Sequence, residues 1–293
     1  MKNIYYFNIV YSCNSKCVFC YSHNTRHDST TNRSIIFEDF RLYLDSHQIS
    51  SNDRVIINGG EPLLHPQIID ILYVLSNIGC EVLVYTNGRL LENYNFSFIT
   101  DKFRFIIPIH GDQQTHDKIT RVSNSYIQTI NGLDYLSKFD AMIDVKIIIN
   151  SLMLSGDNVI DNMTREILGL KDLNSIHLTT MAETLVSKTN RVAPVSLKDS
   201  AILTGKIFNI LRKSVRSIKF FDTCILKIQI NNYSDLIDYP KVFFKDNVQE
   251  WEYGIEKFKG CSQRCALAYC CHSAVKDYTV LEYSDNRFFS NLE

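Results

Sequence analysis

The feature that most constrains the fold is a repeated alternation of short apolar strands with helical segments. Six stretches rich in β-branched and aromatic residues are predicted to be strands: 4–11, 54–58, 81–86, 103–109, 142–150 and 175–180. Helical spacing of apolar residues follows most of them, at 35–47, 66–78, 126–139 and 157–168. Strands joined through helices pair in parallel by right-handed crossovers, so the sequence predicts an α/β fold with a barrel-like or open sheet.

Polar and glycine residues stand directly after the predicted strands. They are Cys13, Gly59, Gly60, Glu61, Asn87, His110 and Asn150. The carboxyl ends of parallel strands meet at one edge of the sheet, and parallel α/β folds carry their chemistry there. We therefore expect the functional site at this edge.

The pattern changes after about residue 185. A helix is predicted over 201–215 and one or two strands over 220–230, while 231–260 is polar and contains the only tryptophan, Trp251. We predict two parts, a core over 1–185 and a small α+β extension over 186–293. The chain has nine cysteines, an odd number that fits a disulfide framework poorly and favours metal ligands in a reducing compartment.

Charge and hydropathy limit the partners. Lys plus Arg number 31 against 32 acidic residues, which gives a formal net charge of -1 and argues against a nucleic-acid partner. No apolar run approaches the ~18 residues of a membrane span, and residues 1–10 are interpreted as a first strand rather than a signal peptide. We expect a cytoplasmic protein without a membrane partner.

Three cysteines with the spacing C-x3-C-x2-C follow the first predicted strand. Cys13, Cys17 and Cys20 can hold three irons of a [4Fe–4S] cube and leave the fourth iron open to an outside ligand. The amine and carboxylate of a chelating amino acid suit that open position. A zinc site completed by His23 or His27 is the alternative, because zinc normally takes four ligands.

With Gly59-Gly60-Glu61-Pro62 after the second strand, these cysteines make the chain resemble the radical S-adenosylmethionine (SAM) superfamily. The resemblance implies a partial (βα)6 TIM-like barrel that binds a [4Fe–4S] cluster and SAM. It places Phe19 near the adenine and the GGEP stretch at the methionyl amino group, with Glu61 accepting from the ammonium. Weaker matches imply SAM contacts for Asn87 and Asn150.

The end of the fourth strand departs from the family pattern, because His110 stands where many relatives have Asp. His116 and Asp117 follow a few residues later. His116 and Asp117 are interpreted either as an acid–base pair facing the substrate or as the start of a helix, where acidic residues complement the dipole. His110, His116 and Asp117 are therefore the weak candidates for catalytic residues.

A second group of cysteines lies in the tail, at Cys261, Cys265, Cys270 and Cys271, with Cys224 standing earlier. Relatives often carry an auxiliary [4Fe–4S] cluster in SPASM or twitch extensions. That resemblance implies Cys224, Cys261, Cys265 and Cys270 as possible ligands, with Cys271 able to replace Cys270. A structural zinc site and free buried thiols are the alternatives.

The resemblance implies reductive cleavage of SAM to a 5′-deoxyadenosyl radical that abstracts hydrogen from a substrate. We expect a maturase of a ribosomally made peptide, supplied with electrons by a flavodoxin or ferredoxin. The alternatives are a radical dehydrogenase or rearrangement enzyme acting on a small metabolite or sugar, and, in another class, a zinc-binding scaffold without catalysis.

Overall fold

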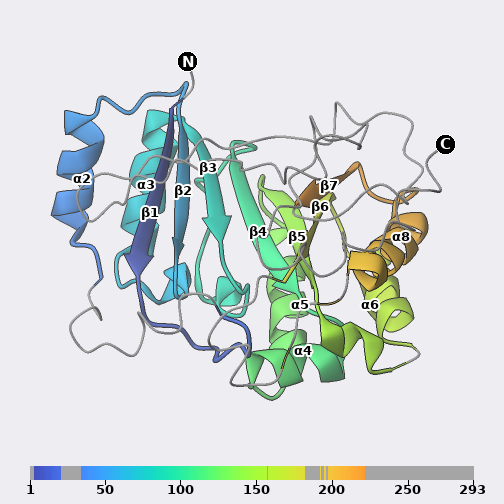
Figure 1. Ribbon diagram of the computed structural model, residues 1–293. Helices are drawn as coiled ribbons and strands as arrows, with labels where there is room; N and C mark the ends of the chain where they lie inside the picture. The colour runs from blue at the N-terminus through green and yellow to red at the C-terminus, as the bar shows by residue number, and fades with distance from the viewer. Residues whose placement is uncertain are drawn as a thin grey trace, which may run out of the picture.

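The computed structural model describes residues 3–20, 34–156, 158–181 and 197–221, together with Val192 and Val195. Seven strands form one parallel sheet in which the spatial order equals the chain order (Figure 1). The strands are β1 (Ile4–Val10), β2 (Arg54–Gly59), β3 (Glu81–Tyr85), β4 (Phe103–Ile109), β5 (Met142–Ile149), β6 (Leu173–Thr180) and β7 (Ser217–Phe221). The predicted α/β fold with a partial barrel of βα units is confirmed.

α-Helices lie in every connection between successive strands except β3–β4, which holds only a 3-10 turn, as expected for βαβ crossovers. They are α2 (Phe37–Ser46), α3 (Ile68–Ile78), α4 (Gln113–Thr120), α5 (Ser125–Leu136), α6 (Val159–Leu168) and α8 (Leu197–Leu211), with short 3-10 turns η1 (Pro62–Leu64), η2 (Leu91–Asn93) and η3 (Ser151–Leu154). Gly79 ends α3 with a left-handed φ of 71°, which a residue without Cβ adopts without strain. No described helix has the length and apolar character needed to cross a membrane.

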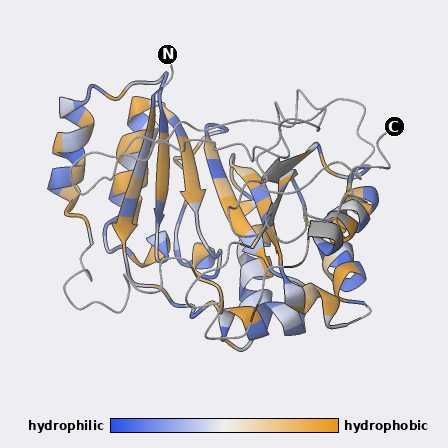
Figure 2. Ribbon diagram, viewed as in Figure 1, coloured by the Kyte–Doolittle hydropathy of each residue, from blue (hydrophilic) through white to orange (hydrophobic). Residues whose placement is uncertain are grey.

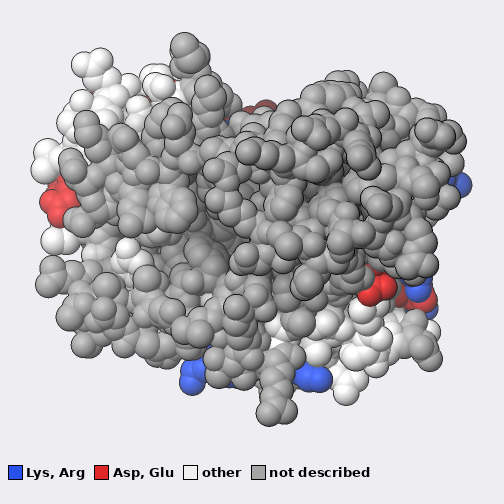
Figure 3. Space-filling model, in the orientation of Figure 1, with Lys and Arg blue, Asp and Glu red and all other residues white. Residues whose placement is uncertain are grey.

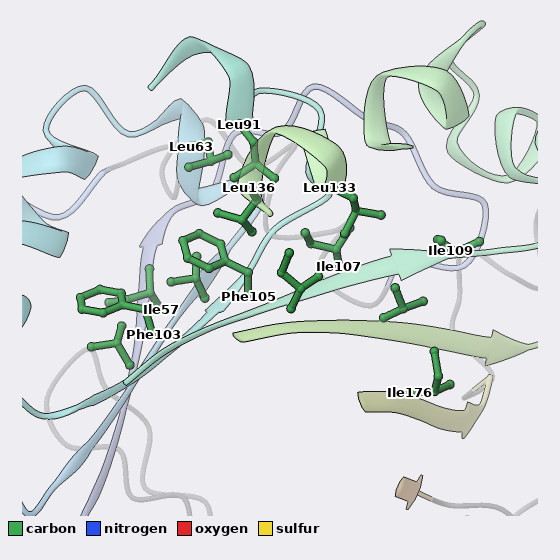
Figure 4. Packing of buried hydrophobic residues seen from close by; sticks show 14 of the residues in the cluster. Ile57, Leu63, Leu91, Phe103, Phe105, Ile107, Ile109, Leu133, Leu136 and Ile176 are labelled. Atoms are coloured by element: carbon green, nitrogen blue, oxygen red, sulfur yellow. The ribbon is translucent and has the colours of Figure 1, made fainter. Parts of the chain in front are cut away.

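The main core lies between the sheet and its helices. Alternate residues of β4, from Phe103 to Ile109, are buried there, and Figure 4 shows Phe105 and Ile107 beside Leu133 and Leu136 of α5. Apolar residues run along the strands and α3 in Figure 2. The intervening strand residues point to the opposite face of the sheet, because side chains alternate along a strand. That face carries most of the charged strand residues.

The sheet continues past residue 185. Strand β7 pairs in parallel with β6, from Ser175 opposite Ser217 to Thr179 opposite Phe221, and α8 packs beside α6. The described part of the predicted extension, 197–221, therefore adds a seventh strand to the sheet predicted with six. The strand expected over 220–230 begins at Ser217 instead, and residues from 222 onward lie outside the described part.

Charged side chains of the described residues are scattered on the surface. On the face shown in Figure 3, Lys and Arg stand at separate points of the rim, and Asp and Glu stand near some of them. Within the described part, this face presents both signs of charge.

Candidate functional site

The three N-terminal cysteines lie on a loop that leaves β1 and runs along the carboxyl edge of the sheet toward α4 (Figure 1). Cys13, Cys17 and Cys20 are all half-buried. The Ser15 amide donates to Cys13 Sγ at 3.4 Å, and the Cys20 amide donates to the Cys17 carbonyl oxygen at 3.2 Å. The thiols are thus carried by a folded loop and remain accessible to a group that arrives from outside.

Cys80 offers a contrast within the same chain. Its side chain is fully buried in the main core, and burial raises the pKa of its thiol to about 11. A thiol in that state is neither a metal ligand nor a nucleophile, because both roles need the thiolate. The expectation of a separate role for the N-terminal cysteines agrees with this difference in surroundings.

The glycines of the GGEP stretch hold the start of the cysteine loop. Gly60 N donates to the Val10 carbonyl oxygen at 2.7 Å, and Glu61 N donates to the Ser12 carbonyl oxygen at 2.9 Å. A Cβ on Gly60 would collide with the Ser12 carbonyl, and Gly59 has a φ of 147°. Glycine is therefore required here so that the end of β2 can approach the backbone immediately before Cys13.

Glu61 ties the ends of two strands together. Its carboxylate is 1% exposed and accepts hydrogen bonds from Thr86 Oγ1 at 2.5 Å, Asn87 N at 2.7 Å and Leu63 N at 3.1 Å. Burial raises the pKa of Glu61, although these hydrogen bonds and the nearby Arg89 act in the opposite direction. The carboxylate is thus a buried acceptor at the carboxyl edge, surrounded directly by neutral donors.

The turn after β3 supports the cysteine loop from a second side. Asn87 Nδ2 donates to Asn14 Oδ1 at 2.6 Å. Arg89 Nη1 donates to the Asn14 carbonyl oxygen at 2.7 Å and to Ser15 Oγ at 3.0 Å. Sequence reasoning singled out Asn87 but missed Arg89, whose one available signal was its place directly after the Thr86-Asn87-Gly88 turn.

Helix α4 supports the loop from a third side. Amides of Lys16 and Val18 donate to the carbonyl oxygens of Thr120 and Ile119, both at 2.9 Å. A small apolar cluster reinforces this pairing; it consists of Val18, Phe19, Ile119, Met181 and Val192. The cysteine loop is therefore held at the ends of β2, β3 and α4 together.

Two buried histidines lie beside this cluster. The rings of Phe19 and His110 pack edge to face with their centroids 5.2 Å apart. The His110 amide donates to His116 Nδ1 at 3.3 Å. Burial lowers the pKa of His110 well below its usual value and that of His116 to about 4, so both rings are neutral near pH 7. Among the described residues, His110 Nδ1 has no hydrogen-bond partner.

Asp117 has a structural task. Its carboxylate accepts from Asn124 N at 2.7 Å, Ser125 Oγ at 2.8 Å and Tyr126 N at 2.8 Å, and so satisfies the first amides of α5. The helix that contains Asp117 is capped by Asp112 instead. The interpretation of His116 and Asp117 as the beginning of a helix was wrong in its position, since both lie in the middle of α4.

The other predicted site residues lie at the same edge or outside the described part. Asn150 follows β5, is fully buried, and uses its side chain locally: Oδ1 accepts from Leu152 N at 3.0 Å and Nδ2 donates to the Ile148 carbonyl oxygen at 2.8 Å. Pro62 is buried in η1. The remaining candidates lie outside the described residues; they are His23, His27, Cys224, Cys261, Cys265, Cys270 and Cys271.

The donor set fits an iron–sulfur cluster. Within the described ranges, no three His, Cys, Asp or Glu side chains converge to hold a single metal ion. A cube needs no such convergence, because each thiolate binds a different iron. The three half-buried thiols on one supported loop can serve as the protein ligands of such a cluster. The Ser15 amide, which donates to Cys13 Sγ, is a hydrogen bond to sulfur of the kind that tunes these clusters.

Comparisons with known proteins agree with this geometry. Curated relatives include an AdoMet-dependent heme synthase from Methanosarcina barkeri, 27% identical over 44% of this chain and 37% of the relative. The antilisterial bacteriocin subtilosin biosynthesis protein AlbA from Bacillus subtilis is 27% identical over 45% of this chain and 30% of the relative. The chain thus covers about a third of the length of either relative.

Solved structures share the fold. Streptococcus suis SuiB bound to S-adenosylmethionine superimposes with a TM-score of 0.56 at 15% identity, over 74% of this chain and 50% of SuiB. The family model described as the Radical SAM superfamily matches residues 7–168, which is more than half of the chain. With the cysteine loop and the supported GGEP stretch inside that range, the chain belongs to the radical SAM superfamily.

Proposed function

We propose that Cys13, Cys17 and Cys20 are the protein ligands of the [4Fe–4S] cluster that membership of the superfamily implies. The observation that carries this proposal is the cysteine loop itself, with half-buried thiols and with support from β2, β3 and α4. When bound, the cluster supplies one electron for the cleavage of SAM. The chain's own residues hold the loop in place through hydrogen bonds from Gly60, Glu61, Asn87 and Arg89.

SAM binds along the carboxyl edge in this proposal. Gly59 and Gly60 present backbone close to Cys13, and Phe19 offers an aromatic surface for the adenine. Glu61, Pro62 and the side chains of Asn87 and Asn150 shape the ends of β2, β3 and β5 around the methionyl part. Hydrogen bonds from Thr86, Asn87 and Leu63 favour the ionised form of Glu61, and this carboxylate would attract the ammonium group of SAM.

The test compares two sets of cysteines. Replacing Cys13, Cys17 and Cys20 together by Ala should abolish one [4Fe–4S] cluster and all SAM cleavage, measured as 5′-deoxyadenosine released with dithionite. Cys80→Ala is the matched control and should keep both the cluster and the cleavage, because its thiol is confined to the core. Release of 5′-deoxyadenosine by the triple variant would refute the ligand assignment.

For the substrate, we propose a ribosomally made peptide. This rests on AlbA, whose name states a part in bacteriocin biosynthesis, and on the fold shared with SuiB, which has also been solved bound to its precursor peptide SuiA. Electrons would come from a flavodoxin or ferredoxin. Incubation with candidate precursor peptides, SAM and reductant should give a peptide of altered mass together with 5′-deoxyadenosine.

A small-molecule substrate is the second candidate. The relatives named heme synthase and GTP 3',8-cyclase support it, since both names state small-molecule products or substrates. The same assay separates the two candidates. Turnover of a small metabolite, with every offered peptide unchanged in mass, would favour this second one.

We also propose an auxiliary [4Fe–4S] cluster in the extension over 186–293, with Cys224, Cys261, Cys265 and Cys270 as ligands. Wild type should then carry about eight irons, and the Cys13/Cys17/Cys20 variant about four. Changing Cys261 and Cys265 to Ala should remove the second cluster and spare uncoupled SAM cleavage. Four irons and one tightly bound zinc in wild type would refute the auxiliary cluster alone.

A further inference from the structure

Arg89 connects three separate parts of the molecule at the cysteine loop. It follows β3, and its Nη1 donates to the Asn14 carbonyl oxygen and to Ser15 Oγ, both inside the Cys13–Cys17 interval. Its Nε donates to Gln128 Oε1 on α5 at 2.7 Å. A planar guanidinium that donates in two directions has a fixed position, unlike a flexible ammonium group.

Within the described part of the chain, no carboxylate forms a hydrogen bond or ion pair with Arg89. Its hydrogen-bond partners among the described residues are a carbonyl, a hydroxyl and an amide oxygen, all of which are neutral. The charge nevertheless reaches its surroundings, because it acts to lower the pKa of both Glu61 and His116. Arginine stays protonated at every working pH, so this positive field is permanent.

We propose that Arg89 is a positioning residue of the cluster, one that shapes the Cys13–Cys17 interval before iron arrives and favours the reduced form of the cluster by its charge. This inference rests on the proposed ligands Cys13, Cys17 and Cys20. Three thiolates and an oxidised cubane carry a net charge of about -1, and one added electron makes it about -2. A fixed positive charge nearby stabilises the more negative form and raises the reduction potential.

Two substitutions separate the charge from the hydrogen-bonding fork. Arg89→Gln removes the charge and retains an amide donor, whereas Arg89→Lys retains the charge and loses the fork. Arg41→Gln, on the exposed side of α2, is the matched control for the loss of one positive charge. Each anaerobically purified holoprotein is titrated with reductant in the absence of SAM and followed by EPR, and iron release to a chelator is timed.

We expect the equilibrium constant for cluster reduction to fall about tenfold in Arg89→Gln, which corresponds to a potential about 59 mV more negative for one electron. Arg89→Lys should keep the wild-type potential but release iron severalfold faster, because its loop is less firmly held. Arg41→Gln should match wild type in both measurements. An unchanged potential in Arg89→Gln, or an equal shift in Arg41→Gln, would overturn the proposal.

The remaining outcomes are also decisive. If Arg89→Gln retains no cluster, the result for Arg89→Lys tests the proposal. A cluster retained at the wild-type potential in Arg89→Lys supports the role of charge, and loss of the cluster in Arg89→Lys overturns the proposal. A wild-type protein that binds no cluster through Cys13, Cys17 and Cys20 would instead refute the ligand assignment, and this result is visible before any Arg89 variant is made.

Discussion

Two buried carboxylates in this sheet have opposite electrostatic surroundings. Glu61, at the carboxyl edge, has three neutral donors, and burial raises its pKa. Asp144, within β5 on the face away from the main core, accepts from Arg104 Nη1 at 2.8 Å, His177 Nε2 at 2.9 Å and Asn174 Nδ2 at 2.7 Å. These partners, His177 first, hold the pKa of Asp144 well below its usual range.

The difference separates structural from functional use of a buried charge. Asp144 already has the Arg104 guanidinium as a cationic partner and two further side-chain contacts, so its negative charge is compensated within the sheet. Among the described residues, Glu61 has no cation in direct contact, so its carboxylate is left uncompensated at the edge where we propose that SAM binds. The comparison assigns Asp144 to stability, and it supports the proposal that Glu61 attracts the cationic part of SAM.

The largest effect should come from Asp144→Asn. This change leaves the half-buried Arg104 without its counter-charge, and breaking a buried pair in this way costs about 3–5 kcal/mol of unfolding free energy. Urea unfolding of anaerobically purified protein measures it. Asp161→Asn, which breaks the exposed pair with Lys206, is the control and should cost less than about 1 kcal/mol. Equal costs in both variants would remove the distinction between the two kinds of pair.

A smaller loss of stability, with an added loss of binding, should follow from Glu61→Gln. The new amide cannot accept from Leu63, Thr86 and Asn87 together, and one buried donor left without a partner costs about 1–3 kcal/mol. SAM affinity measured by calorimetry should fall roughly ten- to a hundredfold while the cluster stays assembled. Unchanged SAM affinity would place Glu61 with Asp144, as a purely structural carboxylate.

The smallest effect is the pH dependence of the unfolding free energy lost in Asp144→Asn and in Glu61→Gln. A tenfold difference in a group's acid dissociation constant between the folded and unfolded chain corresponds to about 1.4 kcal/mol of stability. The pKa of Asp144 is lowered in the folded state, so its stabilisation exists above its usual value of 3.8 and is lost as the pH falls through the folded pKa. The cost of Asp144→Asn, measured by urea unfolding, should therefore shrink as the pH is lowered from about 5.

For Glu61 the sign is reversed. Its folded pKa lies above the usual value of 4.5, so its stabilisation is complete below that pH and is lost as the pH rises through the folded pKa. The cost of Glu61→Gln should thus be greatest in acid and decline toward neutrality. Parallel pH profiles for the two variants would contradict the electrostatic comparison.

Much of the sheet could be predicted because its strands are short apolar runs with clear ends. Strand β7 was harder to place: its sequence, Ser-Ile-Lys-Phe-Phe, holds two polar residues, and the more apolar run begins near its end. Asp144 and Lys146 are the charged residues of a strand that is otherwise apolar, and such an exception was a usable signal. The partners of Asp144 were not predictable, because they depend on the register that sets Arg104 beside Met142 and Asp144 beside Ser175.

The candidate site was predictable where one segment carries the whole signal. Cys13, Cys17 and Cys20 share a single loop, and Gly59 and Gly60 adjoin in the chain. Arg89, by contrast, forms a hydrogen bond with Asn14, 75 residues earlier in the sequence. Asp117 forms one with Tyr126, 9 residues later. No local pattern encodes such a bond, and an isolated charged residue in a turn or helix looks like solvated surface.

The order of the strands has a consequence for how the chain is made. Each strand pairs with the one synthesised just before it, and domains generally fold from the N-terminus during synthesis. The hydrogen bonds that support the cysteine loop, from Gly60 through Arg89 and Thr120 to Gln128, all come from residues before 129. The hydrogen-bonded support of the loop can therefore form on the ribosome before β7 is translated, while the apolar contacts of Met181 and Val192 are added later.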